Sequence, residues 1–185
     1  MADDAQDQQV EIGVAAYDDG DYQRAKAILL PLAEAGHPKA MNMIGLMHYD
    51  TPVFPNDPVL ECDWYEKSAH AGYPAAMYNM SICFDGNGRL KNPETSEAWL
   101  LQAAKNGHIP AMINLSALAP TKGEDYLKWH HMAVNHGNVF AKVSLWLDAY
   151  RNEIPKDEVP DVTLQEIICV SWRIIILDGA FEDCD

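Results

Sequence analysis

The sequence predicts an all-α chain: a short right-handed α-solenoid of stacked antiparallel helix pairs, followed by an apolar C-terminal helix. Two stretches of seven residues, AGHPKAM at 35–41 and AGYPAAM at 71–77, are nearly identical. Glycines recur 36, 35 and 30 residues apart, and an alanine follows each of them four residues later. These glycines are Gly36, Gly72, Gly107 and Gly137. Self-similarity at such a period is typical of a helical repeat array.

Helix start signals precede the first three glycines at a constant distance. Asp21, Asp57 and Asn92 each stand fifteen residues before a glycine, and Asp and Asn are favoured N-caps because their side chains accept from free backbone N–H groups. Pro58 and Pro93 follow two of them, which suits the first position of a helix. We therefore expect capped helices that end at the glycines.

The fourth unit begins differently. Thr121 followed by Glu124 fits a capping box. After each glycine the apolar pattern starts again, as in PAAMYNMSICF at 74–84, which predicts another helix. A single helix pair cannot bury its apolar face alone, so neighbouring pairs must stack.

These helix pairs resemble the Sel-one-like repeat family, whose members are relatives of tetratricopeptide repeats. The resemblance rests on GVAAYDDGDYQRAKAILLPLAEAG at 13–36, on KAMNMIGLMHY at 39–49 and on the glycine-rich connector DGNGRLKN at 85–92. It covers residues 10–142, with His48 at the place of the family's aromatic residue. We assign residues 10–150 to the repeats.

The fourth unit departs from the pattern of the others. The family keeps a small residue where two helices pack closely, and Gly45, Ser81 and Ser116 fit that position. The fourth unit has Trp146 there, and its connector shrinks to PTKG. We therefore expect this unit to pack at an altered angle.

The two ends of the chain lie outside the repeat pattern. We assign residues 1–9 to an acidic N-terminal tail, 151–162 to an acidic, proline-containing loop and 163–185 to a closing helix with an acidic tail. Thr163 and Glu166 form a capping box that opens this helix, which we expect to reach Asp178. Two interpretations stay open: the helix is buried as a closing element, or it forms a homodimer or partner face.

The formal net charge of −15 argues against nucleic acid as a ligand, because phosphate contacts need a basic surface. Residues 1–22 hold seven acids and no lysine or arginine. The acidic ends either keep the chain soluble or attract a partner with a basic surface.

The cysteines and the apolar segments bear on the compartment. Cys62, Cys83, Cys169 and Cys184 show no CxxC spacing, which predicts reduced thiols in a cytoplasmic protein. The start of the chain carries no secretory signal, and the apolar tract at 167–177 is too short to span a membrane. We expect a soluble protein with no membrane partner.

No pattern in the sequence indicates catalysis. The chain has no GxSxG, no HExxH and no phosphate-binding glycine loop. His130, His131 and His136 are not spaced by three or four residues, as two metal ligands on one helical face would be. We expect no enzyme, no cofactor and no metal. The repeated tryptophans and methionines are interpreted as core.

The resemblance implies a concave groove lined by the first helix of each pair, as in tetratricopeptide-like arrays. Its predicted lining is rich in acids and tyrosines, which suits a basic protein segment. The predicted protein-binding residues are Glu11, Asp18, Asp19, Asn42, Tyr49, Asp50, Tyr78, Asp85, Tyr150 and Arg151.

The resemblance implies a protein–protein interaction module. Small bacterial members of the family occur as immunity proteins beside toxins of type VI and related secretion systems. An acidic array without enzyme motifs suits a stoichiometric inhibitor of a basic, nuclease-like toxin. The alternative is an adaptor or regulatory scaffold that holds endogenous proteins together.

Overall fold

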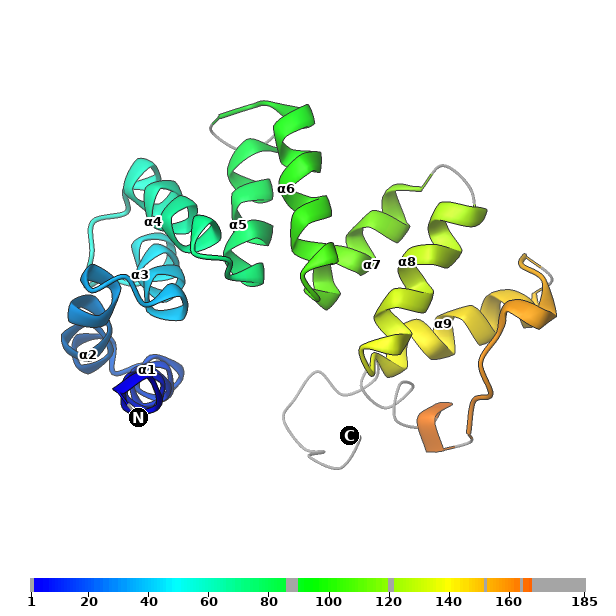
Figure 1. Cartoon of the computed structure of the whole chain (residues 1–185), viewed down its shortest axis with the longest axis horizontal. Coiled ribbons are helices and arrows are strands. Elements are labelled where there is room, and N and C mark those ends of the chain that lie inside the picture. The colour runs from blue at the N-terminus through cyan, green and yellow to red at the C-terminus, as the bar shows by residue number, and fades with distance from the viewer. Residues whose placement is uncertain (1, 86–89, 120–121, 152, 164, 168–185) are drawn as a thin grey trace. The chain divides into compact units, whose positions relative to one another are not determined.

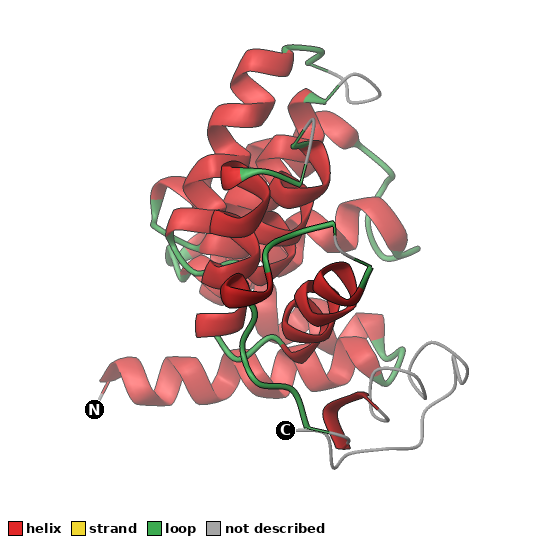
Figure 2. Cartoon of the chain, turned by 90° about the vertical axis from the view of Figure 1, so that its right-hand side faces the viewer, coloured by secondary structure: helices red, strands yellow, loops and turns green. Residues whose placement is uncertain are grey.

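The computed structural model describes residues 2–85, 90–119, 122–151, 153–163 and 165–167 (Figure 1). These residues form helices joined by turns, with no strand among them (Figure 2), which confirms the predicted all-α class. The helices are α1 (Ala2–Asp18), α2 (Tyr22–Glu34), α3 (Pro38–Asp50), α4 (Pro58–His70), α5 (Pro74–Phe84), α6 (Pro93–Lys105), α7 (Ile109–Leu118), α8 (Glu124–Asn135), α9 (Val139–Tyr150) and the 3₁₀ helix η1 (Lys156–Glu158).

The helices pack in chain order and divide into two compact units, Met1–His108 and Ile109–Asp185. In the first unit α1 packs on α2, α3 on α4 and α5 on α6, and each pair also packs on the next. In the second unit α8 packs on both α7 and α9. The predicted stacking of successive helix pairs is therefore confirmed within each unit.

The three predicted N-caps are confirmed. The Asp21 carboxylate accepts from the N–H of Arg24 at 3.2 Å, and the Asn92 side chain accepts from that of Thr95 at 3.1 Å. The Asp57 carboxylate accepts from the N–H of Val59 at 3.0 Å. The predicted helix ends are confirmed as well, because the four repeated glycines have φ between +82° and +93°, a conformation that glycine adopts without strain.

Two boundaries differ from the prediction. The capping box in the fourth unit is wrong: α8 begins at Glu124 after Gly123, which makes no side-chain cap, and Thr121 lies outside the described residues. The segment 1–9, expected to be a tail, is helical from Ala2. It contains neither glycine nor proline, and Asp7 bonds the His37 ring at 2.8 Å, so tertiary contact extends α1 beyond the repeat pattern.

The close-packing position predicted at Gly45 is confirmed in the core of the first unit. Gly45 is buried in α3, and a Cβ added there would lie 2.6 Å from the ring of Tyr65 in α4. The buried side chains around it include Val10, Leu29, Ile44 and Met47. Only a residue without a side chain lets α4 approach α3 this closely.

The second unit has a core cluster of its own, formed by α8, α9 and the residues after α9. Leu145 and Ala149 of α9 pack against Tyr126 of α8 and against Ile154. Trp146, at the place of the small residue in other units, stays on the outside of this core and stacks on Tyr150, with the ring centroids 5.8 Å apart.

The second predicted capping box, Thr163 with Glu166, is confirmed. The N–H of Thr163 donates to the Glu166 carboxylate at 2.7 Å, and the N–H of Glu166 donates to the Thr163 hydroxyl at 3.2 Å. The N–H of Ile167 then bonds the Thr163 carbonyl, as in a first helical turn. The rest of the predicted closing helix, and the homodimer proposed through it, fall on residues 168–185, outside the described part.

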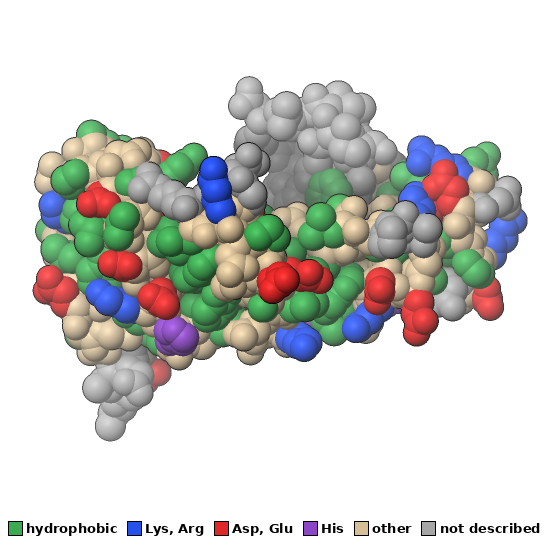
Figure 3. Space-filling model, turned by 90° about the horizontal axis from the view of Figure 1, so that it is seen from above, with side chains coloured by type: hydrophobic (Ala, Val, Ile, Leu, Met, Phe, Trp, Pro, Cys, Tyr) green, Lys and Arg blue, Asp and Glu red, His purple; other side chains and the backbone are tan. Residues whose placement is uncertain are grey.

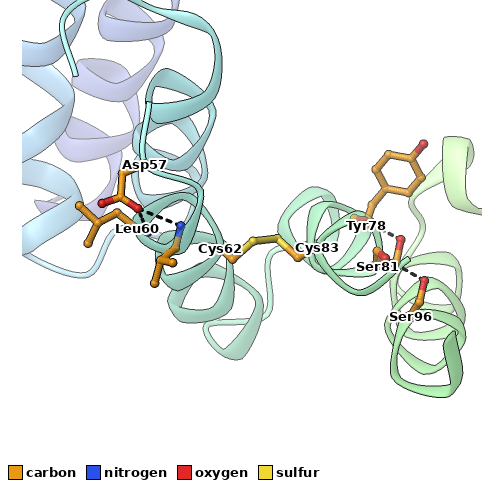
Figure 4. The surroundings of a disulfide bond; sticks show 8 residues. Asp57, Leu60, Cys62, Tyr78, Ser81, Cys83 and Ser96 are labelled. Carbon is orange, nitrogen blue, oxygen red and sulfur yellow. Dashed lines mark hydrogen bonds between the residues drawn. A yellow bond between two sulfur atoms is a disulfide. The ribbon is translucent and has the colours of Figure 1, made fainter. Parts of the chain in front are cut away.

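The prediction of reduced thiols is wrong for two of the four cysteines. Cys62 of α4 and Cys83 of α5 form a disulfide, with their Cα atoms 6.2 Å apart (Figure 4). They are 21 residues apart in the sequence, so no spacing motif marks them. Only the packing of one helix pair on the next brings them together. Cys169 and Cys184 lie outside the described residues.

Candidate protein-binding surface

The first helices of successive pairs are joined by polar contacts in the first unit. The Tyr17 hydroxyl at the end of α1 donates to the Asp50 carboxylate at the end of α3. The Lys39 ammonium of α3 donates to both carboxylate oxygens of Glu11 of α1, at 2.6 and 2.8 Å. The predicted acids Glu11 and Asp50 are thus partners of neighbouring side chains as well as exposed.

Burial raises the pKa of the Tyr17 phenol, and its hydrogen bond to Asp50 raises it further. The phenol therefore stays protonated and keeps Asp50 as its acceptor. This bond joins the C-terminal end of α1 to the C-terminal end of α3.

Four exposed residues stand at the C-terminal ends of α1 and α3, which the Tyr17–Asp50 bond joins. They are Asp18, Asp19, Tyr49 and Asp50, and we call them the acidic tyrosine patch. Asp18 and Asp19 are exposed at the C-terminal end of α1. Tyr49 is 63% exposed, so its ring is accessible to a partner. Four of the ten predicted binding residues are thus exposed at the ends of these two helices.

Asn42 is a predicted binding residue that the structure places inside. It is only 7% exposed and accepts from the side-chain amide of Asn79 in α5 at 2.9 Å. The pair links α3 to α5, so Asn42 has a structural role and offers little surface to a partner.

The remaining predicted residues are scattered. Tyr78 is half-buried, with its ring centroid 4.8 Å from that of His108, and Asp85 is half-buried after the end of α5. In the second unit Tyr150 is 75% exposed and Arg151 is exposed beside it.

The second unit contains a polar network that the sequence did not reveal. The Lys122 ammonium donates to Asp148 and to Glu153, and the Tyr126 hydroxyl donates to the other oxygen of Asp148. Hydrogen bonds to Asp148 and Glu153 raise the pKa of Lys122. Burial is the main cause that raises the pKa of Tyr126. The bonded side chains lie 22–31 positions apart in the sequence, so only the fold brings them together.

The described ranges contain no cluster of three His, Cys, Asp or Glu side chains that could hold a metal ion. Within the same ranges, no helix combines the length and apolar character needed to cross a membrane. Figure 3 shows one face, on which acidic and basic side chains are interspersed among apolar ones.

Among solved structures, the chain is similar to a Sel1 repeat protein from Oxalobacter formigenes. The TM-score is 0.65 and the sequence identity 27%, and the match covers 75% of this chain and 60% of that chain. It is also similar to a protective antigen present in uropathogenic Escherichia coli strains, which displays an SLR fold. That match has a TM-score of 0.64 and 21% identity, and covers 87% of this chain and 36% of that chain.

No protein-family model matches the sequence, and no curated protein matches it. This chain spans 60% and 36% of the lengths of the two solved structures. The structural similarity agrees with the resemblance to Sel-one-like repeats and supports the fold of stacked helix pairs.

Proposed function

We propose that this chain is an immunity protein, a stoichiometric inhibitor that binds and neutralises a secreted bacterial toxin with a basic surface. Repeat arrays use extended surfaces to bind proteins, which is the general role that the structural neighbours support. The identity of the partner goes beyond the fold, because one fold serves many functions. The inhibitor needs no catalytic residue, cofactor or metal.

The acidic tyrosine patch carries the proposal. It combines three carboxylates with a ring that is 63% exposed. Tyrosine supplies a large contact area at binding hot spots, and carboxylates speed the capture of a positively charged partner. The net charge of −15 adds to the attraction at long range.

Capture from the native host tests the existence of such a partner. The tagged full-length chain is used at moderate salt, and co-purifying proteins are identified by mass spectrometry. The proposal expects one basic protein in stoichiometric amount, whose toxicity to cells is abolished when this chain is co-expressed. A captured protein that is not toxic by itself contradicts the immunity role.

Charge reversal at the patch tests how the partner is recognised. Asp18→Lys with Asp19→Lys should slow association by about tenfold or more at low salt. The matched control is Asp63→Lys with Glu97→Lys, the same charge change at exposed positions of α4 and α6, the second helices of their pairs. If both double variants associate equally slowly, net charge alone drives binding and the patch has no special role.

The compartment decides which toxin is blocked. The sequence favours the cytoplasm, where a nuclease-like toxin would act, but disulfides persist mainly in oxidising compartments. The Cys62–Cys83 bond therefore favours an oxidising compartment, and with it a toxin that acts on the cell envelope.

Peptide mapping distinguishes the two compartments. Protein taken from the native host is alkylated at once and digested with trypsin without reductant. A linked pair of peptides covering 40–67 and 68–89 indicates the oxidising compartment. Separate alkylated peptides indicate the cytoplasm.

An adaptor is the second candidate, and the division into two units favours it. Each unit carries an accessible tyrosine, Tyr49 in the first and Tyr150 in the second. An adaptor would bind two proteins at once, whereas an inhibitor forms a binary complex. The mass of the captured complex, measured by light scattering, distinguishes the two.

A further inference from the structure

The second unit contains a pocket lined by residues of α7, α8 and α9. None of these residues belongs to the acidic tyrosine patch. Its volume is about 530 Å³, within the range of about 300–1,000 Å³ typical of ligand sites. Residues from α7, from α9 and its N-cap, and from α8 line it. They are Ile109, Pro110, Ile113, Asn114, His130, Asn138, Phe140, Ala141 and Ser144.

His130 is the buried polar group of this pocket. The residue is only 5% exposed, and α8, which carries it, packs on both α7 and α9. Its Nδ1 lies 3.3 Å from the Tyr126 carbonyl oxygen, and its ring lies on the Tyr126 ring with the centroids 4.1 Å apart. Two contacts with a single neighbour therefore fix the orientation of the imidazole.

The hydrogen bond also fixes the tautomer. A carbonyl oxygen only accepts, so Nδ1 carries the proton and donates it. Burial lowers the pKa of His130, which keeps the ring neutral at physiological pH. The Nε2 atom of a neutral ring with a protonated Nδ1 is an acceptor.

The rest of the lining sets the kind of group that would fill the pocket. Ile109, Ile113 and Phe140 give it apolar walls. An occupant that buries an apolar body there must also bring a donor to Nε2, because a buried acceptor left without a donor is costly. An indole combines a large apolar body with one N–H donor and no competing acceptor.

We propose that this pocket is the anchor site for a tryptophan side chain of the protein partner, whose indole N–H donates to His130 Nε2. The inference rests on the proposed function in that it assumes a protein partner. Tryptophan is also the side chain most enriched at interface hot spots, where it fills pockets of this kind.

The test uses the full-length chain and small probes, so its outcome does not depend on finding the partner. N-acetyl-tryptophanamide is titrated, and binding is followed by the amide shifts of Ala141 and Ser144 in NMR spectra. We expect saturable binding with a Kd on the order of 1 mM. The analogue methylated at the indole nitrogen has no donor and should bind about fivefold more weakly.

His130→Phe should remove the difference between the two probes, because it removes the acceptor and keeps an aromatic ring. His136→Phe, the same change at an exposed position just after α8, is the matched control and should keep the difference. If His130→Phe does not fold, the comparison of the two probes on the wild-type chain decides by itself.

Three results would overturn the proposal: equal affinity of the two probes, tighter binding of N-acetyl-tyrosinamide, or binding that appears only after Trp172→Ala. The last would make the chain's own Trp172, in the segment outside the described residues, the occupant of the pocket.

Discussion

Single tyrosines make the stability of this protein sensitive to alkaline pH. Burial raises the pKa of Tyr65, which is 4% exposed, above the usual value of 10.0. The folded chain then keeps a phenolic proton that the unfolded chain loses above pH 10, so stability falls as pH rises beyond that value. Each such tyrosine steepens the fall by about 1.4 kcal/mol per pH unit.

Tyr65→Phe tests this effect, because it keeps the ring that packs on Gly45 and removes the titrating group. We expect its free energy of unfolding, measured in urea between pH 9 and 11.5, to fall less steeply than that of the wild type. The control is Tyr49→Phe, at a ring that is 63% exposed. Equal slopes in the wild type and Tyr65→Phe would show that ionisation of Tyr65 does not contribute.

Gly45 stands where the packing of α4 on α3 leaves no room for a side chain. A Cβ there would also lie 3.2 Å from the backbone oxygen of Glu61, which cannot rotate away. Gly45→Ala gains helix propensity of about 1 kcal/mol but loses about 1–3 kcal/mol to overpacking. We expect a net loss of up to about 2 kcal/mol in urea unfolding at pH 7.

A double-mutant cycle separates the packing contact from other causes. In a Tyr65→Ala background the added methyl group meets no ring, so Gly45→Ala should become nearly neutral. An unchanged penalty in that background would mean that the backbone of α4, and not the ring, limits the approach.

At this scale the sequence predicted what depends on neighbouring residues. Caps and helix-ending glycines act within a few positions, so Asp57 and Gly72 were assigned correctly. Asn42 could not be assigned, because the amide that buries it belongs to Asn79, one repeat later. His130 was considered only as a metal ligand, since the walls of its pocket come from helices that the sequence does not place side by side.

The disulfide acts at the scale of helices, because it joins α4 of one helix pair to α5 of the next. The bond closes a loop with a sequence separation of 21. Such a loop restricts the unfolded chain by about 3 kcal/mol. Cys62→Ala with Cys83→Ala should lower the stability of the first unit by about that amount.

Hydrogen exchange, measured with and without reductant, locates the loss. In the wild type, reductant should weaken the protection of α4 and α5. The double variant should respond little, because it has no Cys62–Cys83 bond to reduce. An equal response of both proteins would assign the effect to the other two cysteines.

The segment that follows η1 is held to α9 by an ion pair. The Lys142 ammonium donates to Glu166 at 2.6 Å and, with the capping bond from Thr163, lowers the pKa of Glu166 to about 2. The stabilisation that this carboxylate provides is present above pH 4.5 and is lost as pH falls through 2.

Carbon-detected NMR titration of the Glu166 carboxyl group measures this directly. We expect a midpoint of about 2 in the wild type and a higher midpoint in Lys142→Met. Lys39→Met removes a lysine from the first unit and should leave the midpoint unchanged. A midpoint that is the same in all three proteins would show that Lys142 does not set the pKa of Glu166.

At the scale of helices, the repeat period predicted the pairs and most of their boundaries, because the apolar pattern and the caps agree. The prediction failed where contacts between helices determine the structure. Asp7 extends α1 by bonding His37 of the next pair, and Cys62 meets Cys83 across two pairs. Both contacts join helices that the stacking of pairs brings together. No local sequence motif marks either contact.

For the whole molecule, the charge opposes folding. A net charge of −15 on 185 residues repels itself in the compact state more than in the expanded chain. Salt screens this repulsion over about 10 Å at 0.1 M. Raising sodium chloride from about 10 to 200 mM should therefore raise the Tm, since long-range repulsion outweighs surface ion pairs worth at most about 1 kcal/mol each.

Calorimetry on the full chain measures the Tm at each salt concentration. A variant with a smaller net charge provides the comparison. The control carries Asp63→Lys and Glu97→Lys, which bring the net charge from −15 to −11 by two changes of +2 each. Its Tm should rise less with salt than that of the wild type. A Tm that falls with salt in the wild type would mean that pairs such as Glu11 with Lys39 outweigh the net repulsion. The acidic side chains would then stabilise the fold through local ion pairs. Their effect on the capture of a basic partner would have to be shown separately, by measuring association rates.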